Sequence, residues 1–518
     1  MSAAADWVSE RRGWQRYGLA CFAGLASTFA MPPAYAVPLL FVTFPLLIWL
    51  TESSKTWMAS FAAGWWFGVG HFAAGVYWVG NALEIVGVPP MLAVPLPLVL
   101  ALFSAAACAA YWLLQKGGNQ RLLFFAVSWT VFEWLRGHLF TGLPWNLTGY
   151  VWGFSDSISQ VAAYVGPYGL SLVTVAAVCA PALIKERPIG ALSTWRPVIA
   201  AVLAIATLWV AGTVRLMGAA EGIVPGVNLR IVQANISQRD KWKRDQLVEN
   251  FVAHMTLSEE PGQEAVTAFI WPETAVPYFL DERPAHTVTI GRLLAKDGAI
   301  ITGALRRDRD ADGFPRYYNN LTVIAGSGAI VGSYDKMHLV PFGEYVPLRP
   351  LLMALGVEKI VEGAGDYSSG VQQKAIELPG ALPPVAPLIC YEVIFPGAVI
   401  GEGVRPKWLL NLTNDAWYGV TAGPHQHFAS ARFRAIEQGL PVVRAAGTGI
   451  SGIIDSYGRV KAKLGLGKRG VLDGHLPVDA PPPPYSLFGD WNLIVLLAIF
   501  LSPLVGRALF RLRLGSSG

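Results

Sequence analysis

The sequence contains few charged residues for its length. Only 14% of its 518 residues are Asp, Glu, Lys or Arg, and 53% are hydrophobic, whereas soluble domains average about 25% charged residues. This balance excludes an intrinsically disordered chain and argues against a wholly soluble protein. The net charge is only +5, which is too small to indicate nucleic acid as a partner.

Cysteine is also scarce, at four residues. Cys21, Cys108 and Cys179 lie in apolar segments, where a small thiol needs no special role. Cys390 stands alone in the polar part of the chain and has no disulfide partner there. No Cys-x-x-Cys or His-x-x-x-His spacing surrounds it, so we predict no metal site. Its position alone leaves a buried structural thiol and a nucleophile equally open.

The shortage of charge is concentrated in the first half of the chain. Between Phe61 and Leu114 the one Asp, Glu, Lys or Arg is Glu84, whereas charged residues are frequent from about 222 to 480. A last apolar run covers residues 491–505. We therefore predict three parts: a transmembrane domain of seven helices at 1–220, a water-soluble domain at 221–485, and a C-terminal transmembrane helix with a short tail at 486–518.

A membrane-spanning helix needs about 20 mainly apolar residues. The sequence predicts eight such spans, at residues 14–30, 36–51, 57–79, 91–114, 121–138, 160–184, 197–216 and 491–509. The apolar run at the N-terminus is longer than a signal-peptide core, so we expect no cleavable signal peptide.

Basic residues predict the orientation of these spans. Eight spans place both termini and alternate loops on one side. The other side's short loops carry only Arg136 and Arg215. The positive-inside rule makes the more basic side cytoplasmic, so the domain at 221–485 lies outside the cytoplasm. Twelve basic residues mark the cytoplasmic side: Arg11, Arg12, Arg16, Lys55, Lys116, Arg121, Lys185, Arg187, Arg196, Arg507, Arg511 and Arg513.

Polar residues within or beside the spans leave two interpretations open. Glu133 and Arg136 lie three residues apart on one helix face, which favours mutual pairing but also permits a substrate contact. Others lie near the outer helix ends, where they either cap the interface or form a polar rim around a lipid headgroup: His71, Asn81, Glu84, Asn146 and Asp156.

The domain at 221–485 alternates strand and helix signals. Predicted strands cover 228–236, 268–272, 299–305, 321–325, 329–335, 385–389, 408–413 and a pair within 442–455, and predicted helices cover 244–257 and 425–438. This pattern is typical of a layered α/β domain with helices outside. The proline-rich stretch at 480–485 predicts a stiff linker to the last span.

Three residues with reactive or charged side chains follow predicted strands. Glu273, Lys336 and Cys390 each close one, and such residues usually gather at one rim of a sheet. A thiol needs a base, which a carboxylate supplies. A lysine ammonium and a backbone N–H, such as that of Tyr391, stabilise a tetrahedral oxyanion. A Glu or Lys at a strand end is more often a solvated terminus or part of a salt bridge, but Glu, Lys and Cys together suffice for acyl transfer through a thioester.

The sequence around these residues carries a family resemblance. The three segments resemble the Glu–Lys–Cys signature of the nitrilase (carbon–nitrogen hydrolase) superfamily. The stretches 335–347, 389–392 and 412–419, with seven spans before the domain and one after it, resemble the apolipoprotein N-acyltransferase family. The resemblance implies a multi-span α-helical membrane domain and an α/β nitrilase-like domain built as a four-layer αββα sandwich.

The resemblance also implies residue roles. Cys390 is the nucleophile that takes an acyl chain from a phospholipid, Glu273 is the general base and acid, and Lys336 stabilises the oxyanion. Glu344 and Glu392 orient Lys336 and polarise the site. The acyl chain then passes to the free α-amine of a diacylglyceryl-cysteine apolipoprotein. The implied protein is a monomer of the bacterial inner membrane with a periplasmic catalytic domain, and it needs no cofactor.

Aromatic and polar residues near the triad are candidates for substrate binding. Trp242 follows a strand in a loop where a mobile lid is plausible. The candidates for an apolar mouth of the site are Trp242, Tyr391, Trp417 and Tyr418, and the candidates for contacts to backbone or headgroup groups are Asn319, Asn414 and Asp415. Packing or turn capping is an equal alternative for every one of these residues. His425 and His427 open a helix and more often cap or pack than bind metal.

Two other functions remain open. A membrane-anchored nitrilase-like amidase keeps the triad but uses water as the acceptor. A transporter or lipid receptor needs no triad, and the few ionisable residues in the spans argue against transport. The product separates the two enzymes, since an amidase releases free fatty acid and an acyltransferase forms an amide.

Overall fold

The computed structural model describes residues 2–114, 120–186, 192–219, 221–295, 297–347 and 366–502. The chain forms two compact units. The first comprises Met1–Tyr77, Ala93–Gly218 and Pro482–Gly518, and the second comprises Trp78–Leu92 and Ala219–Pro481. The short segment Trp78–Leu92 therefore belongs with the polar part of the chain, although apolar helices flank it in sequence.

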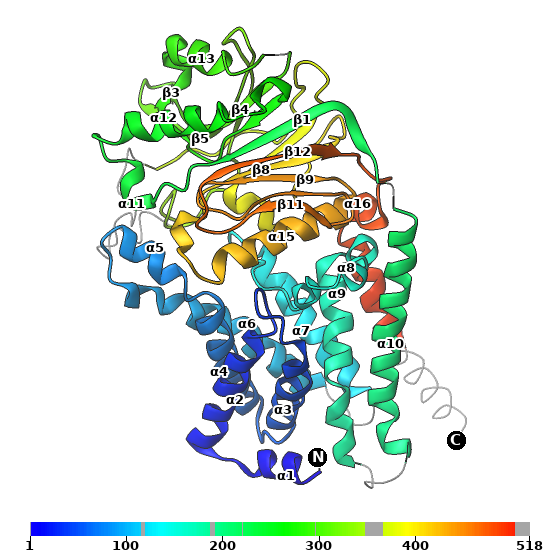
Figure 1. Cartoon of the computed structure of the whole chain (residues 1–518). Coiled ribbons are helices and arrows are strands. Elements are labelled where there is room, and N and C mark those ends of the chain that lie inside the picture. Colours follow the sequence, from blue (N-terminus) through cyan, green and yellow to red (C-terminus); the bar gives the residue numbers. More distant parts are fainter. Residues whose placement is uncertain are drawn as a thin grey trace. The chain divides into compact units, whose positions relative to one another are not determined.

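The first unit is helical (Figure 1). Its α-helices are α1 (Ser2–Glu10), α2 (Gly13–Thr28), α3 (Leu40–Glu52), α4 (Trp57–Gly75), α6 (Pro95–Leu114), α7 (Arg121–His138), α8 (Asp156–Ser159), α9 (Ala162–Val178), α10 (Leu192–Met217), α16 (Pro484–Phe488) and a last helix at Trp491–Ser502. Within the described residues, helix covers most of each predicted span; residues 503–509 of the last span lie outside them.

Three apolar helical segments are long enough to cross a membrane, among the residues that the structure describes. They are Pro90–Leu114, Ala162–Ile184 and Thr194–Met217. Two shorter apolar helices, Val37–Glu52 and Trp491–Ser502, match two further predicted spans. The remaining predicted spans are helices in the structure, but their crossing of a membrane stays a prediction.

The predicted span at 57–79 is shorter in the structure. Helix α4 ends at Gly75 because Val76 leaves the helical conformation, with φ of −127°. The terminal carbonyl of Gly75 accepts a hydrogen bond from Asn146 Nδ2 at 3.2 Å, which supplies the partner that a helix end lacks. A separate helix, α5 (Val79–Ile85), follows in the second unit.

Two of the basic residues that mark the cytoplasmic side are buried in the first unit. Arg16 donates hydrogen bonds to the Leu50 carbonyl and to Ser53 Oγ, and Arg121 Nε lies 3.0 Å from Glu52 Oε1. Both bind the C-terminal end of α3, whose unpaired carbonyls favour cations. These two residues therefore also stabilise the helix packing. Five of the marker residues lie outside the described ranges: Lys116, Arg187, Arg507, Arg511 and Arg513.

The second unit contains two β-sheets. The first has the strand order β12-β1-β2-β4-β5-β6, and β3 also pairs with β4. The second has the order β11-β10-β9-β8-β7. The strands are β1 (Ile223–Gln233), β2 (Ala268–Ile270), β3 (Val276–Phe279), β4 (Ala299–Arg309), β5 (Pro315–Ile324), β6 (Ile330–Asp335), β7 (Val385–Ile389), β8 (Trp408–Thr413), β9 (Val442–Ala446), β10 (Ser451–Ile454), β11 (Val460–Leu464) and β12 (Gly470–Pro477).

The two sheets pack face to face around one apolar core. Side chains of β1, β2, β4 and β5 meet side chains of β7, β8 and β9 in a single buried cluster. Helices α12 (Leu247–Ser258) and α13 (Pro284–Gly291) cover the outer face of the first sheet through a second buried cluster. Helix α15 (Gly423–Gln438) packs against β9 on the other side (Figure 1). The unit is therefore layered as helix, sheet, sheet, helix.

Every strand predicted from the sequence is present, but three further strands among the described residues were missed. Central strands are continuous apolar runs because both of their faces are buried. The missed strands lack such runs: β3 has four residues, β11 alternates apolar residues with lysine, and β12 contains two glycines and two polar side chains. The exposed lysines of β11 are typical of an edge strand that avoids pairing with other chains.

Candidate active site

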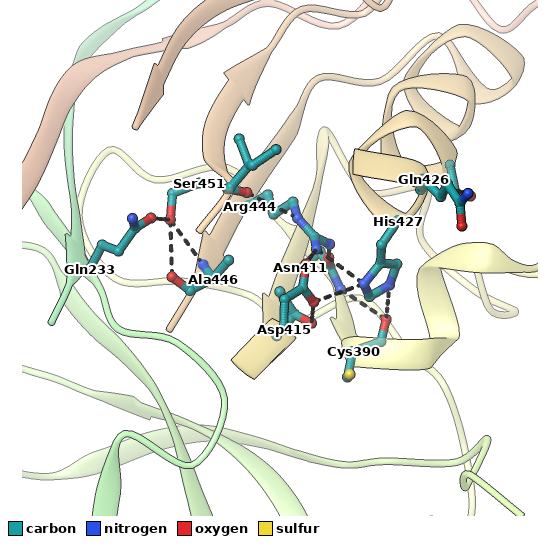
Figure 2. A network of polar contacts seen from close by, with 12 residues as sticks. Gln233, Cys390, Asn411, Asp415, Gln426, His427, Arg444, Ala446 and Ser451 are labelled. Atoms are coloured by element: carbon teal, nitrogen blue, oxygen red, sulfur yellow. Dashed lines mark hydrogen bonds and ion pairs between the residues drawn. The ribbon is translucent and has the colours of Figure 1, made fainter. Parts of the chain in front are cut away.

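Cys390 occupies a sharp turn at the end of a buried strand. Strand β7 ends at Ile389, and Cys390 begins the 3₁₀ helix Cys390–Ile394. Its φ is +51°, in the left-handed region that non-glycine residues rarely adopt and that concentrates at functional sites. Figure 2 shows the sulfur pointing away from the polar groups around the Cys390 carbonyl.

Glu273 follows β2 and is held against the next strand. An added Cβ at Gly303 of β4 would lie 2.6 Å from the Glu273 Cα, so only glycine permits this approach. The carboxylate is buried, and its Oε1 accepts a hydrogen bond from Asn319 Nδ2 at 2.7 Å. The side chain of Asn319, a residue of β5, therefore orients the Glu273 carboxylate.

Lys336 follows β6 and is almost completely buried. Its Nζ lies 3.0 Å from Glu344 Oε1 and 2.8 Å from Glu344 Oε2. A buried ammonium requires such a counter-charge, because its desolvation is otherwise too costly. Asn319 Nδ2 also donates to Glu344 Oε1 at 3.1 Å. The Asn319 amide thus bridges the carboxylates of Glu273 and Glu344, and the Glu344 carboxylate also pairs with Lys336.

The charges of Glu273, Lys336 and Cys390 influence one another. Burial lowers the pKa of Lys336, but the negative charges of Glu344 and Glu273 outweigh it and raise this pKa above its ordinary value. Burial, and then the charge of Glu273, raise the pKa of the Cys390 thiol to about 12, although Lys336 opposes this rise. The structure thus brings together the three residues singled out in the sequence, with a thiol that is protonated at neutral pH and needs a base.

Glu392 is held by backbone groups of the two chain segments that carry Lys336 and Cys390. Its carboxylate accepts hydrogen bonds from the backbone N–H groups of Ile389 at 2.7 Å and Met337 at 2.8 Å. Burial raises the pKa of Glu392, whereas hydrogen bonds from the Ile389 N–H and the Tyr334 hydroxyl, and the charge of Lys336, lower it. In the described residues no hydrogen bond joins Glu392 to Lys336. Glu392 ties the chain before Cys390 to the chain after Lys336, and it interacts with Lys336 through charge and not through a hydrogen bond.

The segment before Trp242 is anchored to the site through Gln238 and Lys241, two residues that the sequence did not single out. Helix α11 (Gln238–Lys241) places Lys241 Nζ 2.9 Å from the Glu273 carbonyl oxygen, and Asn414 Nδ2 donates to Gln238 Oε1 at 2.6 Å. Burial lowers the pKa of Lys241 to about 8. In the sequence, the one signal that could have indicated Lys241 is its position next to Trp242 in a loop. Trp242 itself is 40% exposed.

A small pocket lies beside Glu273, next to its chain neighbours Pro272 and Thr274. Its lining includes Lys241, His254, Thr274 and Asn414. Polar groups therefore reach this space from α11, α12 and the chain after β8. Among the described residues, no group of three or more His, Cys, Asp or Glu side chains is arranged to hold a metal ion.

The other predicted aromatic residues differ in exposure. Tyr418 is buried against Trp78, with 4.4 Å between ring centroids, and Asn81 Nδ2 donates to the Tyr418 carbonyl at 3.1 Å. Tyr391 is buried against Phe395, whereas Trp417 is half-buried. Tyr391 and Tyr418 therefore pack within the domain, and Trp242 and Trp417 remain accessible.

The segment Trp78–Leu92 contributes to this region of the second unit. In addition to the contacts with Tyr418, Glu84 of this segment forms an exposed ion pair of 3.0 Å with Arg239 of α11. Asn81 and Glu84 belong to the polar set predicted as interfacial caps or as a headgroup rim. In the structure both bind protein groups of the catalytic unit.

Glu133 and Arg136 serve the packing of the first unit. Glu133 Oε1 accepts from the backbone N–H of Thr148 at 2.7 Å, and Arg136 Nη1 donates to the carbonyls of Leu143 at 2.6 Å and Trp145 at 2.8 Å. The two charged groups lie 3.9 Å apart. The pair fixes the loop after α7, which favours the structural interpretation of these residues.

The layered α/β unit, with Glu273, Lys336 and Cys390 following three of its strands, defines the class of protein. The family described as carbon–nitrogen hydrolase matches residues 228–480. Among solved structures, Saccharomyces cerevisiae Nit3, a member of branch 10 of the nitrilase superfamily, is 17% identical, with a TM-score of 0.33 over 51% of this chain and 93% of that one.

The remainder of the chain specifies the family further. The apolipoprotein N-acyltransferase N-terminal domain matches residues 23–180. Apolipoprotein N-acyltransferases from Rhodopseudomonas palustris and Bradyrhizobium diazoefficiens are 40% and 39% identical, covering 97% and 94% of each chain. The relative from Brucella melitensis is 36% identical over 97% of both chains. This chain belongs to the apolipoprotein N-acyltransferase family.

Proposed function

We propose that this protein transfers an acyl chain from a membrane phospholipid to the α-amine of a diacylglyceryl-cysteine apolipoprotein. The observation that carries the proposal is the buried, electrostatically coupled set of Glu273, Lys336 and Cys390. It occurs in a chain related over nearly its full length to apolipoprotein N-acyltransferases. The apolar helices of the first unit suit an enzyme whose two substrates are both lipids.

The first half-reaction forms an acyl-enzyme. Glu273 accepts the thiol proton of Cys390, and the thiolate attacks the ester carbonyl of the phospholipid. Lys336 and the backbone N–H of Tyr391 stabilise the tetrahedral oxyanion. The intermediate collapses by breaking its bond to the glycerol oxygen, which takes the proton from Glu273. The products are a Cys390 thioester and a lysophospholipid.

The second half-reaction transfers the acyl chain to nitrogen. The neutral α-amine of the apolipoprotein attacks the thioester carbonyl, and Glu273 accepts the proton released from nitrogen. The carbon–sulfur bond breaks, and Glu273 returns the proton to Cys390. An amide is formed and the free thiol is restored. No step in this sequence requires a nucleotide or a metal ion.

Water must be excluded from the thioester, because hydrolysis competes with attack by the amine. The α11 segment supports this role, since Lys241 docks it on the Glu273 carbonyl and Trp242 remains partly exposed next to it. We assign Trp242 and Trp417 to the apolar substrate contacts. Tyr418 supports that surface through its packing on Trp78.

The same proposal includes a location. The apolar helices and the excess of basic residues on one predicted side support a multi-pass protein of the bacterial inner membrane, with both termini in the cytoplasm. The catalytic unit then lies in the periplasm, next to the outer leaflet of the bilayer that supplies both substrates. A monomer suffices, since one chain carries all three catalytic groups.

Mass spectrometry of the products tests the proposed acceptor. The purified full-length protein is incubated with phospholipid vesicles and a diacylglyceryl-cysteine peptide. We expect the peptide to gain one acyl chain in amide linkage, with an equal amount of lysophospholipid. Release of free fatty acid with an unchanged peptide would instead establish the amidase alternative.

Replacement of Asn319 by leucine tests the bridge between the two carboxylates. We expect kcat to fall roughly 10- to 100-fold, because Glu273 loses the hydrogen bond that orients its carboxylate. The carboxylate then stays buried without that partner. Asn320→Leu is the matched control. Its amide bonds Ser333 and Asp335 from the other face of β5, so stability falls but kcat does not. Equal losses of kcat in both variants contradict the role of Asn319.

A further inference from the structure

A polar network surrounds the carbonyl oxygen of Cys390, on the side away from the sulfur (Figure 2). His427 Nε2 lies 3.2 Å from this oxygen, and Asn411 Nδ2 donates to it at 3.4 Å. A carbonyl oxygen only accepts hydrogen bonds, so its contact with His427 places a proton on Nε2. None of the proposed chemical steps uses His427 or Asn411, although both are completely buried.

The network continues behind His427. The Asp415 Oδ1 lies 2.9 Å from His427 Nδ1, and Arg444 Nη2 lies 2.6 Å from Asp415 Oδ2 and 3.1 Å from His427 Nδ1. Arg444 also donates to Asn411 Oδ1. The four side chains come from β8, the chain after β8, α15 and β9 (Figure 2). The ring of His427 is thus held between a carboxylate, a guanidinium and the nucleophile's own backbone.

The peptide unit that follows Cys390 explains why this carbonyl matters. A trans peptide is planar, and its C=O and N–H point in opposite directions. The carbonyl of Cys390 and the N–H of Tyr391 belong to one such unit. Any group that fixes the carbonyl therefore also aims the Tyr391 N–H. The positive φ of Cys390 is intrinsically unfavourable, so the surrounding contacts must maintain it.

We propose that His427, held by Asp415 and Arg444, is a positioning residue for acyl transfer. Its Nε2–H fixes the Cys390 carbonyl, and through the peptide plane it directs the Tyr391 N–H towards the developing oxyanion. Asn411 supports the same oxygen. This inference rests on the proposed function, because it requires that Cys390 form a tetrahedral intermediate.

Two substitutions of one residue separate positioning from packing. Glutamine places its amide nitrogen near the position of the imidazole Nε2, whereas asparagine reaches only the position of Nδ1. His427→Gln therefore keeps a donor for the Cys390 carbonyl, and His427→Asn keeps only the contacts with Asp415 and Arg444. Each variant is prepared as the full-length protein, and acylation of Cys390 by labelled phospholipid is followed in single turnover.

We expect His427→Asn to lower the rate of acyl-enzyme formation roughly 10- to 100-fold. Its KM for phospholipid stays within about twofold of the wild-type value, because His427 does not contact the substrate. His427→Gln retains a rate within about threefold of wild type, because the lost donor is restored. The pH dependence of Cys390 alkylation by iodoacetamide is unchanged in both variants, since burial and the charge of Glu273, the two largest causes of the raised thiol pKa, are retained.

Ser451→Ala is the matched structural control. It removes a buried hydrogen bond of 2.7 Å from Ser451 of β10, in the second sheet, to Gln233 of β1, in the first sheet, but leaves the Cys390 carbonyl untouched (Figure 2). We expect its acylation rate to be unchanged, with a lower thermal midpoint. If His427→Asn does not fold, Asn411→Asp serves instead, because it removes the second donor and keeps the acceptor for Arg444.

Three results overturn the inference. They are an acylation rate in His427→Asn equal to wild type, a loss in His427→Gln as large as in His427→Asn, and a loss in Ser451→Ala as large as in His427→Asn. The wild-type protein distinguishes these from failure of the proposed function. If wild-type Cys390 is never acylated, the proposed function itself fails, whereas normal wild-type acylation with unaffected His427 variants removes only the positioning role.

Discussion

Replacing Cys390 with alanine is expected to abolish acyl transfer, with a loss of roughly 10⁴-fold or more. The variant lacks the atom that forms the thioester, and no neighbouring group replaces it as a nucleophile. Alanine removes only one sulfur atom and keeps a Cβ at the same left-handed position, so the fold and the stability change little. The measurement is incubation with labelled phospholipid, followed by detection of hydroxylamine-sensitive label on the protein.

Cys108→Ala is the matched control for this experiment. Cys108 is also a free, buried cysteine, but it lies in α6 of the first unit. We expect this variant to keep both the label and the transfer activity. Label that persists in Cys390→Ala contradicts the thioester mechanism. If the wild type shows no acylation and Cys390→Ala still binds or moves lipid normally, the protein is a receptor or transporter instead.

Replacing Glu273 with glutamine is expected to have two opposite effects. Acyl transfer falls by roughly 10³-fold or more, because no group remains to accept the thiol proton. The pKa of Cys390 nevertheless falls below its wild-type value of about 12, because a negative charge that raises it is removed while Lys336 stays. Burial is the largest cause of the raised pKa and is retained, so the value remains above that of a free cysteine.

The two effects are measured on the same protein. The rate of iodoacetamide alkylation of Cys390, recorded from pH 7 to 11, reports the pKa of the thiol. We expect the curve of Glu273→Gln to lie at lower pH than that of the wild type, so at pH 9 the inactive variant is alkylated faster. An unshifted curve shows that the Glu273 charge does not reach Cys390, and it removes the basis for a general-base role.

Much of the fold was predictable because local runs of apolar residues indicate the helices and the central strands. Apolar runs such as Val385–Ile389 are strands because both faces of a central strand are buried, and long runs such as Pro95–Leu114 are helices. Strand β12 was not predictable. Its partly exposed sequence pairs with β1, more than 200 residues earlier in the chain, and no local signal indicates that partner.

The candidate site likewise has residues that were predictable from the sequence and residues that were not. Glu273, Lys336 and Cys390 stand next to recognisable strands, so the sequence alone singled them out. The partners of these residues were less predictable. Asn319 was singled out only as a possible substrate contact, whereas its amide binds the carboxylates of Glu273 and Glu344. Lys241 was missed because its contact with the Glu273 carbonyl depends on how the α11 segment folds back.

The sequence by itself determined the division into an apolar and a polar part, the positions of the helices and central strands, and the three residues proposed for catalysis. These properties depend on residues that are neighbours along the chain. The tertiary structure alone decided that Trp78–Leu92 joins the catalytic unit, that Glu392 binds backbone groups, and that His427 holds the Cys390 carbonyl. Buried polar groups must find partners wherever the packed sheets and helices bring them, and that choice is made in space and not along the sequence.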